Sequence, residues 1–232
     1  GDVYKRQEDL KPNRLEAAKD VAAEFINGRP NDNIGITLFA GETFTQCPLT
    51  VDHAVLLDMI HNIKCGLITD GTAVGMGIAN AVTRLKDSKA KSKVIILLTD
   101  GTNNKGDISP MTAAEIAKSF GIRVYTIGVG TNGMAPYPYP VGNTVQYVSM
   151  PVEIDEKTLT EIAGTTDGNY FRATSNSKLK EVYEEIDKLE KTKLNVKEYS
   201  KRDEEYHWFA LAAFLCVLLE VLLRNSVLKK IP

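Results

Sequence analysis

The sequence predicts an α/β domain with a doubly wound, Rossmann-like, mostly parallel sheet and helices on both faces, followed by a C-terminal transmembrane helix. Short apolar runs alternate with amphipathic segments of helical period, as in chains that build a parallel sheet. The run VIILL at 94–98 is apolar without interruption, which is typical of a strand covered on both faces. A second apolar run, at 208–223, contains Glu220 as its one charged residue.

The composition is that of an ordinary globular protein. Of the 232 residues, 43% are hydrophobic and 25% are charged, which excludes disordered, collagen-like and disulfide-scaffold chains. The net charge of −2 leaves no basic surplus for phosphates, so we expect no nucleic-acid partner. Cys47, Cys65 and Cys216 are too few and too scattered for a disulfide framework or a cysteine zinc site. The sequence leaves open whether Cys47 and Cys65 pair.

The first half of the domain is predicted to contain three helices and two strands. Asp52 is a plausible N-cap for the predicted helix at 52–62, because its carboxylate can accept a hydrogen bond from a free backbone N–H in the first turn. The predicted elements are a helix at 15–26, a strand at 34–40, a short edge strand at 43–49, a helix at 52–62 and a helix at 75–85.

The second half continues the alternation. Gly121 is expected to end the helix that precedes it. The Pro-rich stretch 134–142 is predicted to be a surface loop near the site, with contact to a partner as the alternative. The predicted elements are a strand at 94–98, a helix at 111–120, a strand at 124–129, a helix at 155–163, a strand at 169–173 and a charged helix at 177–191.

Two loop motifs carry the functional prediction, because doubly wound sheets bind ligands outside the carboxyl ends of their strands. Asp100 follows the apolar strand in LLTDGTNN, and Asp70 and Thr72 open a helix in ITDGTAVG. Each motif alone has a plainer interpretation, an Asp-Gly turn for the first and a helix N-cap from Asp70 or Thr72 for the second. Together, the hydroxyl of Thr72 and the carboxylate of Asp100 are hard oxygen ligands suited to Mg²⁺ or Mn²⁺.

Other motifs are weaker. GVGTNG at 128–133 fits GxGxxG, but the prolines after it cannot open a helix, so no pyrophosphate site is expected. The chain contains no GxxxxGK[ST]. The segment Asp107–Met111 reads DxSxM, and we interpret it as a helix N-cap.

Longer segments of the chain are similar to a known family. KPNRLEAAK, FAGETFTQCPLT, LLTDGTNNKGDISPMTAAEIA, VYTIGVGT and EVYEEIDKLEK resemble the von Willebrand factor A (VWA) domains of the membrane-anchored bacterial Bat aerotolerance proteins. The resemblance runs from about Glu8 through Pro232. It implies a metal-ion-dependent adhesion site (MIDAS) built from DxSxS after the first strand, a threonine at a helix entry and an aspartate after the fourth strand. Thr72 and Asp100 match the second and third pieces.

The chain departs from the family pattern at its beginning. GDVYKRQ stands where a strand ending in DxSxS is expected, so we expect a VWA-type fold that lacks its first central strand. We interpret the sequence as a fragment, with Mg²⁺ or Mn²⁺ binding weak or absent and with exposed strand edges that favour instability or self-association.

The predicted organisation has five parts. The domain helix at 177–191 leads through a juxtamembrane linker into the apolar run. The parts are 1–7 as a stretch outside the family pattern, 8–192 as the VWA domain, 193–206 as the linker, 207–228 as the transmembrane helix and 229–232 as a cytoplasmic tail.

The flanks of the apolar run suggest an orientation. Arg224, Lys229 and Lys230 follow the run without an acidic residue, whereas the residues before it are of mixed charge. The positive-inside bias therefore puts the C-terminus in the cytoplasm and the VWA domain in the periplasm, anchored in the bacterial inner membrane. The alternative is a buried C-terminal helix of a soluble core.

The leading functional hypothesis is a membrane-anchored, non-enzymatic domain for metal-dependent protein–protein interaction. The resemblance implies that a partner protein completes the metal's coordination with an Asp or Glu carboxylate. It also implies that the partners are related membrane proteins of the envelope, and that the role is linked to aerotolerance. No small-molecule substrate is expected. The alternative is a Mg²⁺-dependent phosphatase or hydrolase, which would need a nucleophile or general base that is not visible beside Asp100. A third possibility is a structural scaffold with an inert metal site.

Overall fold

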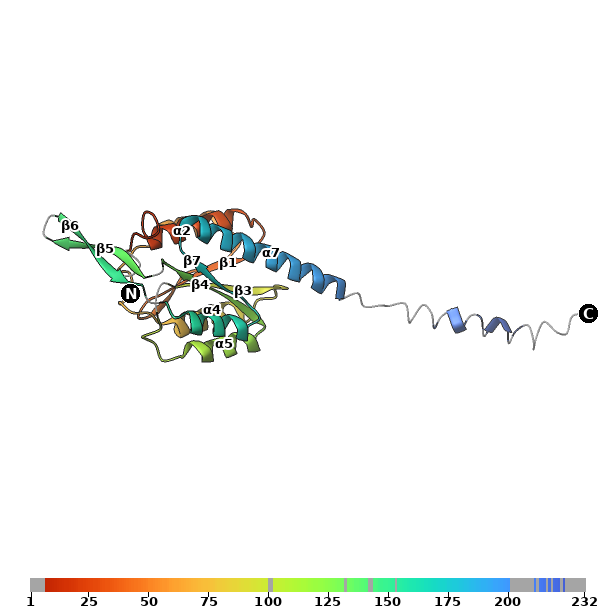
Figure 1. Ribbon diagram of the computed structural model, residues 1–232. Helices are drawn as coiled ribbons and strands as arrows, with labels where there is room; N and C mark the ends of the chain where they lie inside the picture. Colours follow the sequence, from red (N-terminus) through yellow and green to blue (C-terminus); the bar gives the residue numbers. More distant parts are fainter. Residues whose placement is uncertain are drawn as a thin grey trace, which may run out of the picture. The chain divides into compact units, whose positions relative to one another are not determined.

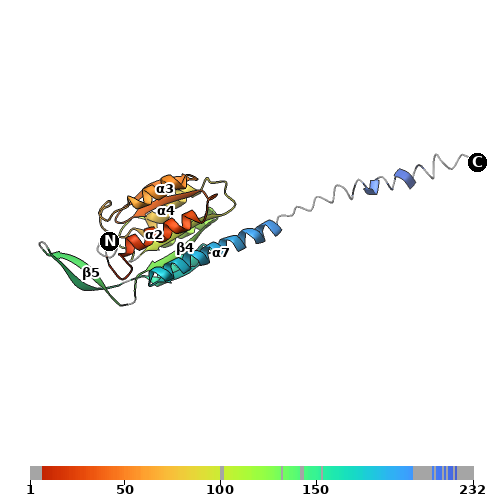
Figure 2. The ribbon, with the colours of Figure 1, turned by 90° about the horizontal axis from the view of Figure 1, so that it is seen from above.

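The computed structural model describes residues 7–99, 102–131, 133–141, 144–152 and 154–200, together with 211, 213–215, 217, 219–221 and 223. The chain divides into two units, Gly1–Glu190 and Lys191–Pro232. The first unit contains the strands and the helices that cover them (Figures 1 and 2).

The first unit is an α/β domain, as the sequence predicts. Its helices are α2 (Arg14–Asn27), α3 (His53–His61), α4 (Val74–Leu85), α5 (Pro110–Ser119), α6 (Glu156–Thr165) and the start of α7 (Asn176–Ser200). Its strands are β1 (Ile34–Phe39), β2 (Thr43–Thr50), β3 (Lys93–Thr99), β4 (Ile122–Val129), β5 (Met134–Val141), β6 (Thr144–Pro151) and β7 (Tyr170–Ala173).

The central sheet is parallel and has the order β3-β4-β7. Leu97 lies opposite Thr126, and Thr126 lies opposite Tyr170, so the carboxyl ends of the three strands share one edge. β1 and β2 form a separate antiparallel pair. The first central strand, which the chain is predicted to lack, would lie between β1 and β3. In the described residues β1 and β3 belong to different sheets, and α4 packs against both.

Side chains of β4 alternate between two hydrophobic cores. Val124 packs with α4, α5 and α6 on one face, and Tyr125 packs with α2 and α7 on the other. Figure 1 shows these helices on opposite sides of the sheet. The predicted strand at 124–129 is therefore correct, and burial on both faces explains why it is apolar.

Several predicted helix ends are confirmed. Asp52 caps α3 by accepting from the backbone N–H of Val55 at 3.2 Å, and Ser109 caps α5 by accepting from Thr112 N–H at 3.1 Å. The DxSxM segment is thus a helix start, as interpreted. α5 ends before Gly121, whose φ of +64° is a left-handed conformation suited to glycine.

The prediction of a surface loop at 134–142 is wrong for residues 134–141. They form β5, which pairs with β6, a strand that sequence analysis did not predict. Prolines favour loops, but they are tolerated in a strand where no N–H is needed for the ladder. The GxGxxG run leads into this strand rather than into a helix, as expected.

The cysteine question left open by the sequence is resolved for two residues. Cys47 and Cys65 do not form a disulfide with each other. Cys47 lies in a small core between α2, α3 and the β1–β2 pair. Burial there raises the pKa of its thiol.

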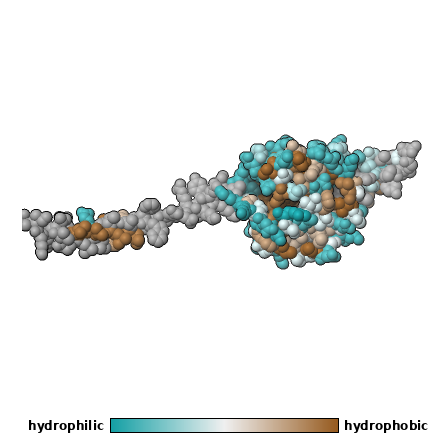
Figure 3. All heavy atoms as spheres, turned by 180° about the vertical axis from the view of Figure 1, so that it is seen from behind, coloured by the Kyte–Doolittle hydropathy of each residue, from teal (hydrophilic) through white to brown (hydrophobic). Residues whose placement is uncertain are grey.

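In the second unit, large apolar side chains are exposed (Figure 3). They are Leu211, Phe214, Leu215, Val217, Leu219, Val221 and Leu223. In the described part of the chain, no helix has both the length and the apolar character required to cross a bilayer. Most of the predicted span at 207–228 lies outside the described residues, so the span stays a prediction.

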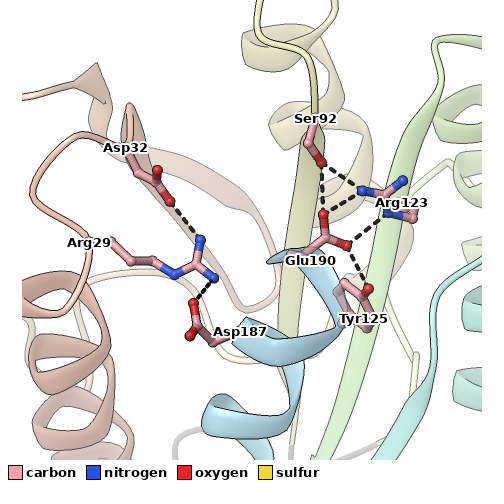
Figure 4. Close-up of polar contacts among 7 residues, drawn as sticks. All are labelled: Arg29, Asp32, Ser92, Arg123, Tyr125, Asp187 and Glu190. Carbon is pink, nitrogen blue, oxygen red and sulfur yellow. Dashed lines mark hydrogen bonds and ion pairs between the residues drawn. The ribbon is translucent and has the colours of Figure 1, made fainter. Parts of the chain in front are cut away.

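A buried charge network joins α7 to the amino ends of β3 and β4 (Figure 4). Glu190 is 4% exposed and accepts hydrogen bonds from Ser92 Oγ at 2.8 Å, Arg123 Nε at 2.9 Å and Tyr125 OH at 2.6 Å. Burial alone would raise the pKa of Glu190, but the bonds from Arg123, Tyr125 and Ser92 outweigh it, and the pKa is lowered.

A second ion-pair group lies beside this network (Figure 4). Arg29, which follows α2, donates to Asp32 at 2.6 Å and to Asp187 of α7 at 2.5 Å. Because Arg29 and Asp187 are far apart in the chain, the pair fixes α7 against the end of α2.

We expect Glu190→Gln to lower the free energy of unfolding by about 3–5 kcal/mol, because Arg123 is left buried without its counter-charge. The measurement is urea unfolding of the full chain followed by circular dichroism. Glu185→Gln, an exposed position on the same helix, is the matched control and should change little. Equal stability of the two variants would contradict the assignment.

The effect should depend on pH. The folded pKa of Glu190 lies below its ordinary value of 4.5, so its stabilisation is fully present above pH 4.5. It is lost as the pH falls through the lowered folded value. The stability difference between Glu190→Gln and the natural chain should therefore be constant from about pH 5 to 7 and shrink in more acidic solution. A difference that grows on acidification would contradict the sign of the shift.

Candidate functional site

The candidate site lies at the carboxyl edge of the sheets, where three loops meet. They follow β1, precede α4 and follow β3. Ligands of open α/β sheets bind at this edge, outside the ends of the strands.

Thr72 lies at this edge and is 5% exposed. Its backbone N–H donates to Asn104 Oδ1 at 2.9 Å, and its carbonyl accepts from the N–H of Asn104 at 2.9 Å. Asp100 lies outside the described residues. Thr99, the residue before it, is buried at the end of β3. The structure thus joins the entry of α4 to the loop that contains Asp100 in sequence, and the predicted pair of ligands stays a prediction.

The alternative interpretation of Asp70 or Thr72 as the N-cap of α4 is wrong. Ala73 holds the N-cap position and makes no side-chain cap bond. Asp70 Oδ1 instead accepts from the N–H of Gly71 at 3.0 Å, within its own turn. The side chain that satisfies the N–H of Val74 is Asn103, whose Oδ1 accepts it at 2.8 Å.

Asn103 and Asn104 are site residues that sequence analysis missed. Both side chains accept backbone N–H groups at the start of α4, about thirty positions earlier in the chain. The helix is therefore capped by a neighbouring loop rather than by its own residues. The signal in the sequence is the adjacent asparagine pair after TDGT, since asparagine is a preferred capping side chain.

Glycines allow the loops to touch backbone to backbone. A Cβ on Gly41 would lie 2.7 Å from the carbonyl oxygen of Asp70, and one on Gly71 would lie 2.8 Å from Gly41 Cα. Gly71 also has a φ of +145°, which L side chains rarely adopt. The N–H of Gly41 donates to the carbonyl of Thr69 at 2.7 Å, and that of Ala73 donates to the carbonyl of Ala40 at 2.7 Å. The loop after β1 is thereby fixed to the entry of α4.

A second missed feature lies beyond the carboxyl end of β4. Asp9 accepts from Arg14 Nε at 2.8 Å and Nη2 at 2.7 Å, and from the backbone N–H of Thr131 at 2.8 Å. Both charged side chains are buried. Burial alone would raise the pKa of Asp9, but the bonds from Arg14 and Thr131 outweigh it and the pKa is lowered. The pair fixes the segment before α2 to the loop after β4.

A parallel sheet between helical layers, with loops joined at its carboxyl edge, is the arrangement of a doubly wound α/β domain. The chain belongs to the von Willebrand factor type A domain family, whose family model matches residues 6–185. Domains of this family commonly bind a divalent cation at a MIDAS. Those of the Bat type are generally non-enzymatic.

Two solved structures are similar over most of the domain. An aerotolerance-related membrane protein from Bacteroides fragilis is 32% identical, with a TM-score of 0.69 over 80% of this chain and 94% of that one. The BatB protein from Bacteroides thetaiotaomicron is 33% identical, with a TM-score of 0.70 over 81% of this chain and 94% of that one. The resemblance to Bat proteins is therefore confirmed.

A third protein of uncharacterized function matches a larger share of this chain than the two solved structures do. An uncharacterized protein from Borreliella burgdorferi is 27% identical over 220 residues, which is 94% of this chain. The chain spans 64% of that protein's length.

We expect Asn103→Ala to lower the free energy of unfolding by about 1–2 kcal/mol, because the N–H of Val74 loses its cap. Asn103→Asp is the matched control. It keeps the acceptor oxygen and adds a negative charge at a helix N-terminus, so it should be as stable as the natural chain. Urea unfolding measures both. Equal losses in the two variants would show that the cap bond is not the cause.

Proposed function

We propose that this chain is a membrane-anchored VWA domain that mediates divalent-metal-dependent protein–protein interaction. The hydroxyl of Thr72 and the carboxylate of Asp100 bind Mg²⁺ or Mn²⁺ at the carboxyl edge of the sheet. An Asp or Glu carboxylate from a partner protein completes the coordination.

The observation that carries the proposal is the pair of hydrogen bonds between Thr72 and Asn104, each 2.9 Å long. Asn104 lies four positions after Asp100, in the same loop. The bonds join the backbone of Thr72 to Asn104, which follows the predicted carboxylate ligand closely in the sequence. This supports a shared site, because a cation needs its ligands within about 2.0–2.6 Å.

The donor chemistry fits a hard cation, but the donor set is small. Hydroxyl and carboxylate oxygens suit Mg²⁺ and Mn²⁺. Within the described residues, no group of three or more His, Cys, Asp or Glu side chains is placed to hold a metal ion. With Thr72 and Asp100 as the two proposed ligands from this chain, water and the partner would fill the remaining positions, so we propose weak affinity in the absence of a partner.

The proposed location is the bacterial inner membrane, with the VWA domain in the periplasm and the C-terminus in the cytoplasm. The apolar run at 208–223 and the basic residues after it support this orientation. The proposed partners are related membrane proteins of an envelope complex linked to aerotolerance. The naming of the Bacteroides fragilis neighbour as an aerotolerance-related membrane protein supports that role.

The proposed ligands can be tested by Mn²⁺ titration of the full chain, followed by electron paramagnetic resonance. We expect binding on the order of millimolar, within the weak range for oxygen sites. Thr72→Ala and Asp100→Asn should each weaken it about tenfold or more. Thr72→Ser keeps the hydroxyl and serves as the matched control. Equal binding by Thr72→Ala and Thr72→Ser would remove Thr72 from the site.

The interaction itself can be tested by pull-down of the related envelope proteins with the full chain in detergent. Capture should require Mg²⁺, should be lost with EDTA, and should be lost in Asp100→Asn. Neither the natural chain nor the Asp100→Asn variant should hydrolyse p-nitrophenyl phosphate. Capture that persists in EDTA would favour a structural scaffold, and hydrolysis abolished by Asp100→Asn would favour the enzyme alternative.

A further inference from the structure

The β5–β6 hairpin projects from the body of the first unit (Figures 1 and 2). Its two strands pair along their whole length, from Met134 opposite Pro151 to Val141 opposite Thr144. In the described residues it is a two-stranded sheet with no third strand. Isolated two-stranded ribbons are marginally stable in water, so an additional strand would stabilise this one.

The prolines of β5 determine which backbone groups point outward. Pro136, Pro138 and Pro140 lie opposite Ser149, Tyr147 and Val145. Opposite residues in an antiparallel ladder alternate between hydrogen-bonded and non-hydrogen-bonded pairs, and a proline has no N–H to donate. These three pairs are therefore the non-hydrogen-bonded ones, whose backbone polar groups point away from the partner strand.

One hydrogen bond supports this assignment. The carbonyl of Pro136 accepts from the backbone N–H of Glu8 at 3.2 Å, so it points away from β6. At its three proline positions the outer edge of β5 thus offers carbonyls but no N–H donors. Such an edge does not accept another strand, and proline is a device by which natural sheets protect their edges.

The outer edge of β6 has the opposite character. Val145, Tyr147 and Ser149 present both an N–H and a carbonyl outward, since none of them is a proline. The strand, TVQYVSMP, has no charged side chain to discourage pairing. Tyr147 is 61% exposed and Val148 is 47% exposed, so apolar surface accompanies the open edge. The hairpin therefore has one closed edge and one open edge.

We propose that β6 pairs antiparallel with β6 of a second copy of this chain. The resulting sheet would have the order β5-β6-β6-β5, and both of its outer edges would be the proline-containing strands. Pairing of identical edges about a two-fold axis closes after two copies, and the prolines prevent further addition. A second copy is favoured over a strand of another protein because the outward residues are spaced evenly about Tyr147, so the edge is complementary to itself in an antiparallel pair.

The register of the pairing follows from the outward residues. They lie at 145, 147 and 149, symmetric about Tyr147. A two-fold axis at Tyr147 places Tyr147 opposite its own copy and Val145 opposite Ser149. All three outward residues then find a partner, with about six backbone hydrogen bonds, two for each of three pairs.

The test is sedimentation velocity of the full chain in detergent with EDTA, over a range of concentrations. We expect a monomer–dimer equilibrium that is insensitive to EDTA, which separates it from the metal-dependent interaction proposed above. Tyr147→Pro should weaken the dimer about tenfold or more, because each copy loses the N–H at the two-fold axis. The hairpin should survive, since that N–H is not used against Pro138.

Two further variants keep the test decisive. Tyr147→Phe retains the N–H and loses the hydroxyl, which lies 3.5 Å from Glu8 Oε1, and it should dimerise like the natural chain. Ser149→Pro removes a second outward N–H and should weaken the dimer as well. A chain that is monomeric at every concentration, or an assembly unchanged in Tyr147→Pro and Ser149→Pro, overturns the proposal.

The register can be measured by cross-linking in a background in which Cys47, Cys65 and Cys216 are replaced by Ala. Hydrogen-bonded antiparallel pairs have Cα atoms about 5.5 Å apart, which suits a disulfide. Tyr147→Cys should therefore form a disulfide-linked dimer on oxidation. Met150→Cys, which lies far from its own copy in this register, should not. Cross-linking at 150 in preference to 147 overturns the proposed axis.

Discussion

The structure depends on the burial of both faces of β4. Successive side chains of this strand enter different cores, one with α4, α5 and α6 and the other with α2 and α7. The two helical layers are therefore fixed relative to one strand. The parallel register with β3 and β7 then brings the carboxyl ends of three strands to one edge. The candidate site is at this edge because the polar ends of the strands and the helix entries meet there.

The regular elements were largely predictable, because their signals are local. The runs at 94–98 and 124–129 are apolar since they lie between two helical layers, and Asp52 and Ser109 cap helices within their own sequence neighbourhood. The hairpin at 134–151 was not predicted. Its prolines are compatible with a strand only in one register of pairing, and that register depends on a second strand that local patterns do not identify.

The part of the candidate site that follows from local sequence patterns was predictable. Thr72 lies at the carboxyl edge as the motif indicated, because helix entries and strand ends follow from local patterns. The roles of Asn103 and Asn104 could not be read from the sequence, since they act on backbone groups of a distant segment. The contact of Asp9 with the loop after β4 was missed for the same reason, because Asp9 accepts a hydrogen bond from the backbone of Thr131, which is distant in the chain. The loops at the carboxyl edge are joined by hydrogen bonds between segments that are distant in the sequence, and residue types alone do not predict such bonds.

The network around Glu190 has a mechanical consequence. It lies at the amino ends of β3 and β4, and α7 continues beyond it to Ser200. Tension applied through the last turns of α7 would reach this carboxylate before it reached the apolar contacts of Ile186 and Tyr183. Separation at this point would leave Arg123 buried without its counter-charge, which is costly. The position of a single buried glutamate would thus set the pulling force at which the helix separates from the sheet.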